Sequence, residues 1–72
     1  MQGITVDKSI NGYYVKAPGF IINVSADDFG GVCVSYSGKI PHKLKRMLEK
    51  NKHLFVTVDL AKTLISNELM RL

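Results

Sequence analysis

The chain has 72 residues, of which 46% are hydrophobic and 22% charged, and its formal net charge is +4. This composition is typical of a folded domain and argues against disorder, while the length allows only one domain, spanning residues 1–72. No apolar run approaches the ~20 residues of a membrane span, and the N-terminus lacks a signal-peptide pattern, so we expect a cytoplasmic protein with no membrane contact. A chain of this size buries only about 60% of its unfolded surface. A larger partner or a homodimer would therefore add stability.

A first β-hairpin is predicted around Asn11-Gly12, a dipeptide that favours a type I′ turn. Counting outward from this turn places Lys8 opposite Val15 and Asp7 opposite Lys16. The sequence therefore predicts a hairpin with one apolar and one polar face.

A second hairpin turn is predicted at Pro18-Gly19. It places Val15 opposite Ile22 and Tyr13 opposite Val24, although Pro-Gly favours a type II turn, so a loop one or two residues wider is the alternative. The two turns agree on one apolar face, which we interpret as the core: Val6, Ile10, Tyr13, Val15, Ala17, Phe20, Ile22 and Val24.

The next segment, residues 25–31, reads SADDFGG and predicts one helical turn with Phe29 packed beneath it. A fourth strand is expected from Val32 to Tyr36. It contains Cys33, the only cysteine, which we interpret as a small core residue because a free cysteine packs like an apolar side chain.

A basic amphipathic helix is predicted between Lys39 and His53, with the sequence KIPHKLKRMLEKNKH. This segment holds six Lys or Arg and one acid, a charge of +5, whereas the rest of the chain holds four basic and five acidic residues. At 100° per residue an apolar stripe faces the sheet: Ile40, Leu44, Met47, Leu48 and Asn51. Four basic residues, which we call the basic flank, lie together beside this stripe: Lys39, Lys43, Arg46 and Lys50.

A fifth strand is predicted from Leu54 to Val58, joined by a crossover and therefore parallel to another strand. A last helix is expected from Asp59 to the end of the chain. Glu68 is its misfit, because it falls in the middle of the apolar arc. Either the helix frays or bends near Ser66-Asn67, or Glu68 meets a basic group of another chain.

These elements predict an α+β fold: a mainly antiparallel sheet of about five strands, in the order β-β-β-β-α-β-α, with both helices packed on one face. The opposite face would be more polar. Tyr14 and Ile21 would be its interaction anchors.

Chemical motifs are weak in this sequence. Gly38-Lys39 precedes a helix, but the phosphate-loop pattern also requires an earlier glycine, where Cys33 stands, and a hydroxyl residue, where Ile40 stands. The adjacent acids Asp27 and Asp28 are better explained as a solvated turn than as a cation site. We therefore expect no enzyme, no cofactor and no metal.

Two functions remain for the basic flank. The first is a non-catalytic protein-binding module that occupies an acidic surface of a larger host or cognate protein; by analogy of size and simplicity, such modules are typical of phage and mobile-element inhibitors and accessory proteins. The alternative is a nucleic-acid-binding regulator that uses the same helix on phosphates, which a sequence pI of about 9.4 favours. The predicted partner-binding residues are Lys39, Lys43, Arg46, Lys50, Tyr14 and Ile21.

Overall fold

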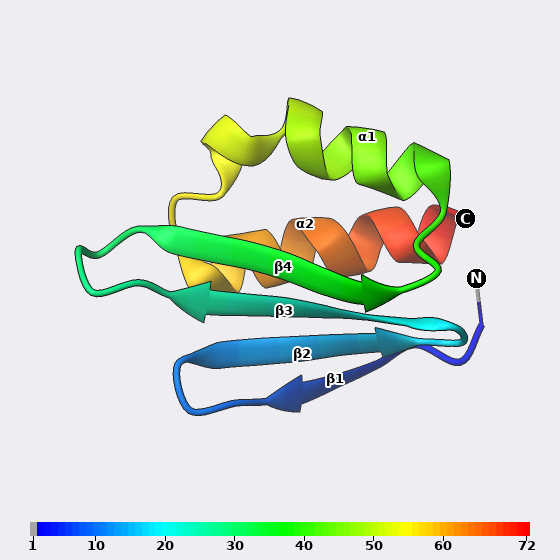
Figure 1. Cartoon of the computed structure of the whole chain (residues 1–72), viewed down its shortest axis with the longest axis horizontal. Coiled ribbons are helices and arrows are strands. Elements are labelled where there is room, and N and C mark those ends of the chain that lie inside the picture. The colour runs from blue at the N-terminus through cyan, green and yellow to red at the C-terminus, as the bar shows by residue number, and fades with distance from the viewer. Residues whose placement is uncertain (1) are drawn as a thin grey trace.

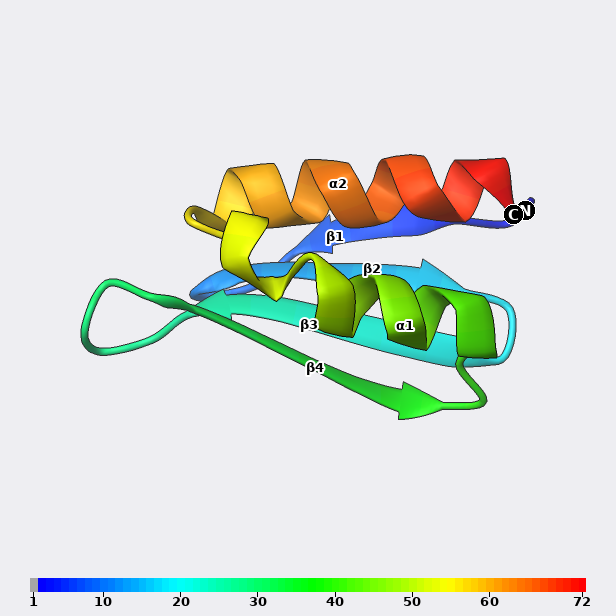
Figure 2. The same cartoon turned by 90° about the horizontal axis from the view of Figure 1, so that it is seen from above.

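A computed structural model describes residues 2–72 and has an α+β architecture, with a four-stranded antiparallel sheet in the order β1-β2-β3-β4 and two α-helices (Figure 1). Both helices lie on the same face of the sheet, and the other face is uncovered (Figure 2). The elements are β1 (Thr5–Lys8), β2 (Gly12–Ala17), β3 (Phe20–Ala26), β4 (Val32–Gly38), α1 (His42–Lys50), the 3₁₀ turn η1 (Lys52–Leu54) and α2 (Val58–Arg71).

The predicted fifth strand from Leu54 to Val58 is wrong. The segment contains the end of η1 and the start of α2, and Thr57 caps α2 by accepting a hydrogen bond on Oγ1 from the backbone amide of Leu60. Phe55 is buried in the core, whereas Val56 is 65% exposed. Local capping at Thr57 and the single anchor at Phe55 outweigh the β-propensity of so short a run.

The first hairpin keeps the predicted alternation of faces but has a different register. Ile10 and Val6 do not join the core as predicted, because Ile10 lies between the strands and is fully exposed and Val6 is 42% exposed. Val6 lies opposite Val15 and Asp7 opposite Tyr14, and the chain turns through a wider loop than a two-residue turn at Asn11-Gly12. Asp7 and Lys16 are therefore diagonal rather than opposite, although Oδ2 of Asp7 and Nζ of Lys16 still form an ion pair at 2.9 Å.

Gly12 explains the shift, because it belongs to β2 and has no positive φ. A Cβ at this position would lie 1.9 Å from the carbonyl oxygen of Val24. The glycine is therefore required for close approach to β3 rather than for a type I′ turn.

The second hairpin confirms the predicted pairing. Ala17 lies opposite Phe20, Val15 opposite Ile22 and Tyr13 opposite Val24. The loop contains only Pro18 and Gly19, and the φ of +93° at Gly19 is the left-handed conformation that the second loop residue of a type II turn requires.

The loop between β3 and β4 is a turn, not the predicted helical turn. Oδ1 of Asp27 accepts hydrogen bonds from the amides of Phe29 and Gly31, at 2.8 and 2.7 Å. Phe29 is 97% exposed instead of being packed beneath the loop. Cys33 is also exposed, contrary to the prediction, because its side chain lies on the uncovered face of β4.

The core lies between the sheet and the helices. The predicted stripe of α1 supplies Leu44 and Leu48, while α2 packs on β2 and β3. The buried residues of the core are Val15, Phe20, Ile22, Val24, Leu44, Leu48, Phe55, Ala61, Ile65 and Leu69. Ile40, Met47 and other partly buried residues surround them.

Leu44→Ala should lower the free energy of unfolding by about 2–5 kcal/mol, because Leu44 is fully buried and the change leaves a cavity. Thermal or urea unfolding measures the loss. Met70→Ala is the matched control, since Met70 is 67% exposed and its truncation should change stability little. Equal stability of the two variants would show that α1 does not pack on the sheet.

Tyr13 on β2 forms a side-chain hydrogen bond to the N-terminal end of α2. Its hydroxyl donates a hydrogen bond to Oδ1 of Asp59 at 2.7 Å, and Nζ of Lys62 lies 4.6 Å from the centre of its ring. The hydrogen bond to Asp59 raises the pKa of Tyr13 above its ordinary value of 10.0, with further contributions from burial and from the negative charge of Asp59.

This raised pKa predicts a pH dependence. The folded state holds the Tyr13 proton more tightly than the unfolded state, so the stabilisation is fully present below pH 10 and is lost as the pH rises through the raised pKa. Tyrosinate absorbance should include a phase above the ordinary range, and Tyr13→Phe should remove it. A titration that keeps this phase in the variant would contradict the assignment.

Candidate functional site

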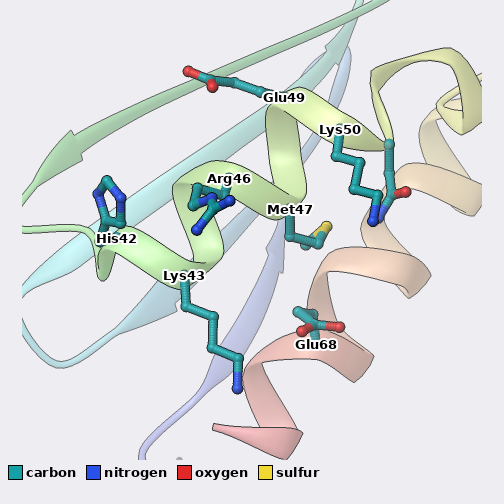
Figure 3. A pocket seen from close by; sticks show the side chains of 8 residues that line it. His42, Lys43, Arg46, Met47, Glu49, Lys50 and Glu68 are labelled. Carbon is teal, nitrogen blue, oxygen red and sulfur yellow. The ribbon is translucent and has the colours of Figure 1, made fainter.

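An open groove of about 1060 Å³ runs between α1 and α2 (Figure 3). It is much more open than an enclosed ligand cavity. Small-molecule sites enclose most of their ligand, so this open shape suits a segment of a macromolecule better. The residues that line it are His42, Lys43, Arg46, Met47, Glu49, Lys50, Asn51 and Glu68.

The α1 wall of the groove carries three of the four residues of the basic flank. Lys43, Arg46 and Lys50 recur at intervals of three and four residues, so one side of the helix presents them together. Figure 3 shows Lys43 and Lys50 extending toward α2, with Met47 between them. The wall therefore combines positive charge with an apolar contact.

The α2 wall carries Glu68. Helix α2 continues without a break to Arg71, so the predicted fraying near Ser66-Asn67 is wrong. Glu68 lies where the apolar arc of α2 turns toward α1, which explains why it interrupts the pattern. Its side chain is only 26% exposed, and its Oε2 lies 4.0 Å from Nη1 of Arg71.

The charge of the groove is positive but not uniform. Glu49 points away from α2 in Figure 3, so it does not oppose Glu68 across the groove. Lys43 and Lys50 thus extend toward the α2 wall and its one partly shielded carboxylate, while Arg46 lines the groove on the α1 side. The groove presents donors on one side and an acceptor on the other.

Lys39 does not line this groove. It is an exposed residue that precedes α1, and its backbone amide donates to the carbonyl oxygen of Gly19 at 2.9 Å. The structure therefore separates Lys39 from the three other residues of the basic flank.

Tyr14 and Ile21 lie on the uncovered face of the sheet, as predicted. They are 40% and 39% exposed, and they line a shallow depression of about 410 Å³ together with Lys16 and Asn23. Because the helices cover the opposite face, this depression and the groove are two separate surfaces.

Met47 and Glu68 line the groove but are not among the predicted partner-binding residues. Met47 was assigned to the face lying on the sheet, and it is partly buried but also exposed to the groove. Glu68 gave a signal, since a carboxylate within an apolar arc indicates contact with something other than the core.

Metal binding has no support among residues 2–72, where no three His, Cys, Asp or Glu side chains are grouped to hold an ion. Over the same residues, neither helix has the length and apolar character needed to cross a bilayer.

Comparison of the chain with protein-family models, curated proteins and solved structures found no match.

Proposed function

We propose that this protein is a non-catalytic protein-binding module, which acts by occupying an acidic surface of a larger partner through the groove between α1 and α2. The partner segment places carboxylates against Lys43, Arg46 and Lys50 and an apolar side chain against Met47. An inhibitor or accessory role follows from this mode of action, because a bound module of this size covers a partner surface without transforming it.

Glu68 is the observation that carries the proposal. A phosphate backbone that enters the groove would meet this carboxylate on the α2 wall and be repelled. A protein segment can complement both the positive and the negative wall, with its own carboxylates toward α1 and a basic or hydroxyl donor toward Glu68. The mixed charge of the groove thus favours a protein over a nucleic acid.

Nucleic acid is the second candidate, and the net charge of +4 favours it. In that mode three neutralised phosphates would make log affinity fall with log salt at a slope of about −0.9 × 3 on a duplex, with little dependence on sequence. A protein partner would show a weaker dependence, mainly in the association rate.

Reversal of the α1 wall tests the site. A variant with Lys43→Glu, Arg46→Glu and Lys50→Glu should keep its circular dichroism and melting temperature, because surface substitutions cost little stability. It should lose the capture of a protein partner from native lysate treated with nuclease. Capture that disappears with nuclease in the wild type, or survives in this variant, would overturn the proposal.

A matched control carries the same charge change elsewhere. Lys8→Glu, Lys16→Glu and Lys39→Glu combine three exposed lysines that do not line the groove. This control should retain partner capture. Loss of capture in the control alone would move the site to the sheet surface around Tyr14 and Ile21.

Glu68 gives a prediction of opposite sign for the two functions. Glu68→Lys removes an acceptor that a protein partner uses, so partner capture should fall, whereas affinity for phosphates should rise. Fluorescence anisotropy with a labelled duplex measures the second quantity, and Glu68→Gln is the control for side-chain shape. Tighter duplex binding together with unchanged partner capture would favour the nucleic-acid function.

A further inference from the structure

The two edges of the sheet differ in how they are protected. The edge strand β1 has four residues and carries Asp7 and Lys8, and short charged edges disfavour pairing with another chain. The other edge strand, β4, has seven residues with the sequence VCVSYSG, which contains no charge and no proline. It therefore lacks the side chains that ordinarily prevent strand addition.

The backbone of β4 has a free row of hydrogen-bonding groups. At one end the amide of Asp27 donates to the carbonyl of Gly31, and at the other the amide of Lys39 donates to the carbonyl of Gly19. Pairing alternates along an antiparallel ladder, so the odd-numbered residues of β4 face β3. The amides and carbonyls of Val32, Val34 and Tyr36 consequently point away from the sheet.

A side-chain cavity lies next to this free row. It has a volume of about 170 Å³, is partly open, and is bounded by β4 on one side and by α1, η1 and Phe55 on the other. A cavity of roughly 150 Å³ accepts a benzene ring, so this one accepts a single leucine- or phenylalanine-sized side chain. The residues that line it are Val32, Val34, Tyr36, Lys45, Leu48, Glu49, Lys52 and Phe55.

The charged residues that line the cavity carry a net positive charge. Lys45 and Lys52 contribute two positive charges and Glu49 one negative charge, and apolar side chains supply the remainder of the lining. An added strand with an acidic residue beside its apolar anchor matches this pattern.

We propose that β4 binds an extended acidic segment of a partner protein by strand addition, with one large apolar side chain in the cavity beneath α1. Main-chain hydrogen bonds to Val34 and Tyr36 provide affinity, and the cavity with Lys45 and Lys52 provides specificity. This site is distinct from the groove between α1 and α2, since it lies on the β4 side of α1.

A single extended strand fits this edge better than a second copy of the chain. Figures 1 and 2 place α1 over the β4 side of the sheet. Pairing of β4 with β4 of another copy would bring two α1 helices to the same space above the seam, which a lone strand avoids.

The test uses a displayed library of random twelve-residue peptides as the probe and the full chain as the bait. Enriched peptides should alternate apolar and polar residues, with one Leu, Phe or similar side chain and an adjacent Asp or Glu. Failure to enrich any peptide over a bait-free control would overturn the proposal.

Two substitutions at one position then separate the backbone from the side chain. Val34→Pro removes an amide that faces away from β3, and Val34→Ala removes the same side chain but keeps the amide. Enriched peptides should bind the proline variant about tenfold or more weakly than the alanine variant, because a buried carbonyl of the peptide loses its donor. Circular dichroism and thermal melting check that both variants fold.

Charge reversal completes the test. Lys45→Glu with Lys52→Glu should weaken the binding of the enriched acidic peptides severalfold, while the groove variant at residues 43, 46 and 50 should not. Equal binding by the two Val34 variants, or loss of binding in the groove variant instead, would overturn strand addition. A wild-type dimer in sedimentation that Val34→Pro dissociates would assign the edge to a second copy and also overturn it.

Discussion

The contact between α2 and the centre of the sheet is the interaction on which the rest of the structure depends. Ile65 and Leu69 are fully buried against β2 and β3, whose Val15 and Ile22 are also fully buried. Burial of each such side chain contributes roughly 1.5–3 kcal/mol, and a small domain has a net stability of only about 5–15 kcal/mol. The sheet therefore has one face that must be covered, and α2 covers its middle.

The short helix α1 covers what α2 leaves exposed, and this arrangement creates both candidate surfaces. Leu44 and Leu48 anchor α1 to the core, Lys43 and Lys50 face the groove toward α2, and Lys45 lines the cavity toward β4. Three sides of this nine-residue helix thus contact the core, line the groove and line the β4 cavity, respectively. Loss of the anchor would disturb the groove and the β4 cavity together, whereas charge reversal on one side would disturb only one of them.

The sequence by itself determined the α+β class, the second hairpin with its register, the amphipathic helix with its basic flank and the apolar face of β2 and β3. These features depend on local rules: alternation along a strand, the turn preference of Pro18-Gly19, and the angular spacing of residues on a helix. The same rules marked Glu68 as anomalous without indicating what it faces.

Only the tertiary structure decided the remaining features, because they depend on neighbours that are distant in the sequence. A glycine is required at position 12 because the backbone of Val24 lies so close, and not because of a turn preference. Gly12 therefore belongs to β2 instead of the turn, and the first hairpin has a different register from the predicted one. The alternation of Leu54, Val56 and Val58 resembles a strand. The segment instead connects two helices, because Phe55 is buried in the core and Thr57 caps α2. The groove exists only because α1 and α2 pack side by side on the sheet. The spacing of residues along α1 predicted the basic residues of one wall. It could not predict that Glu68 lies opposite them, because that depends on how the two helices pack.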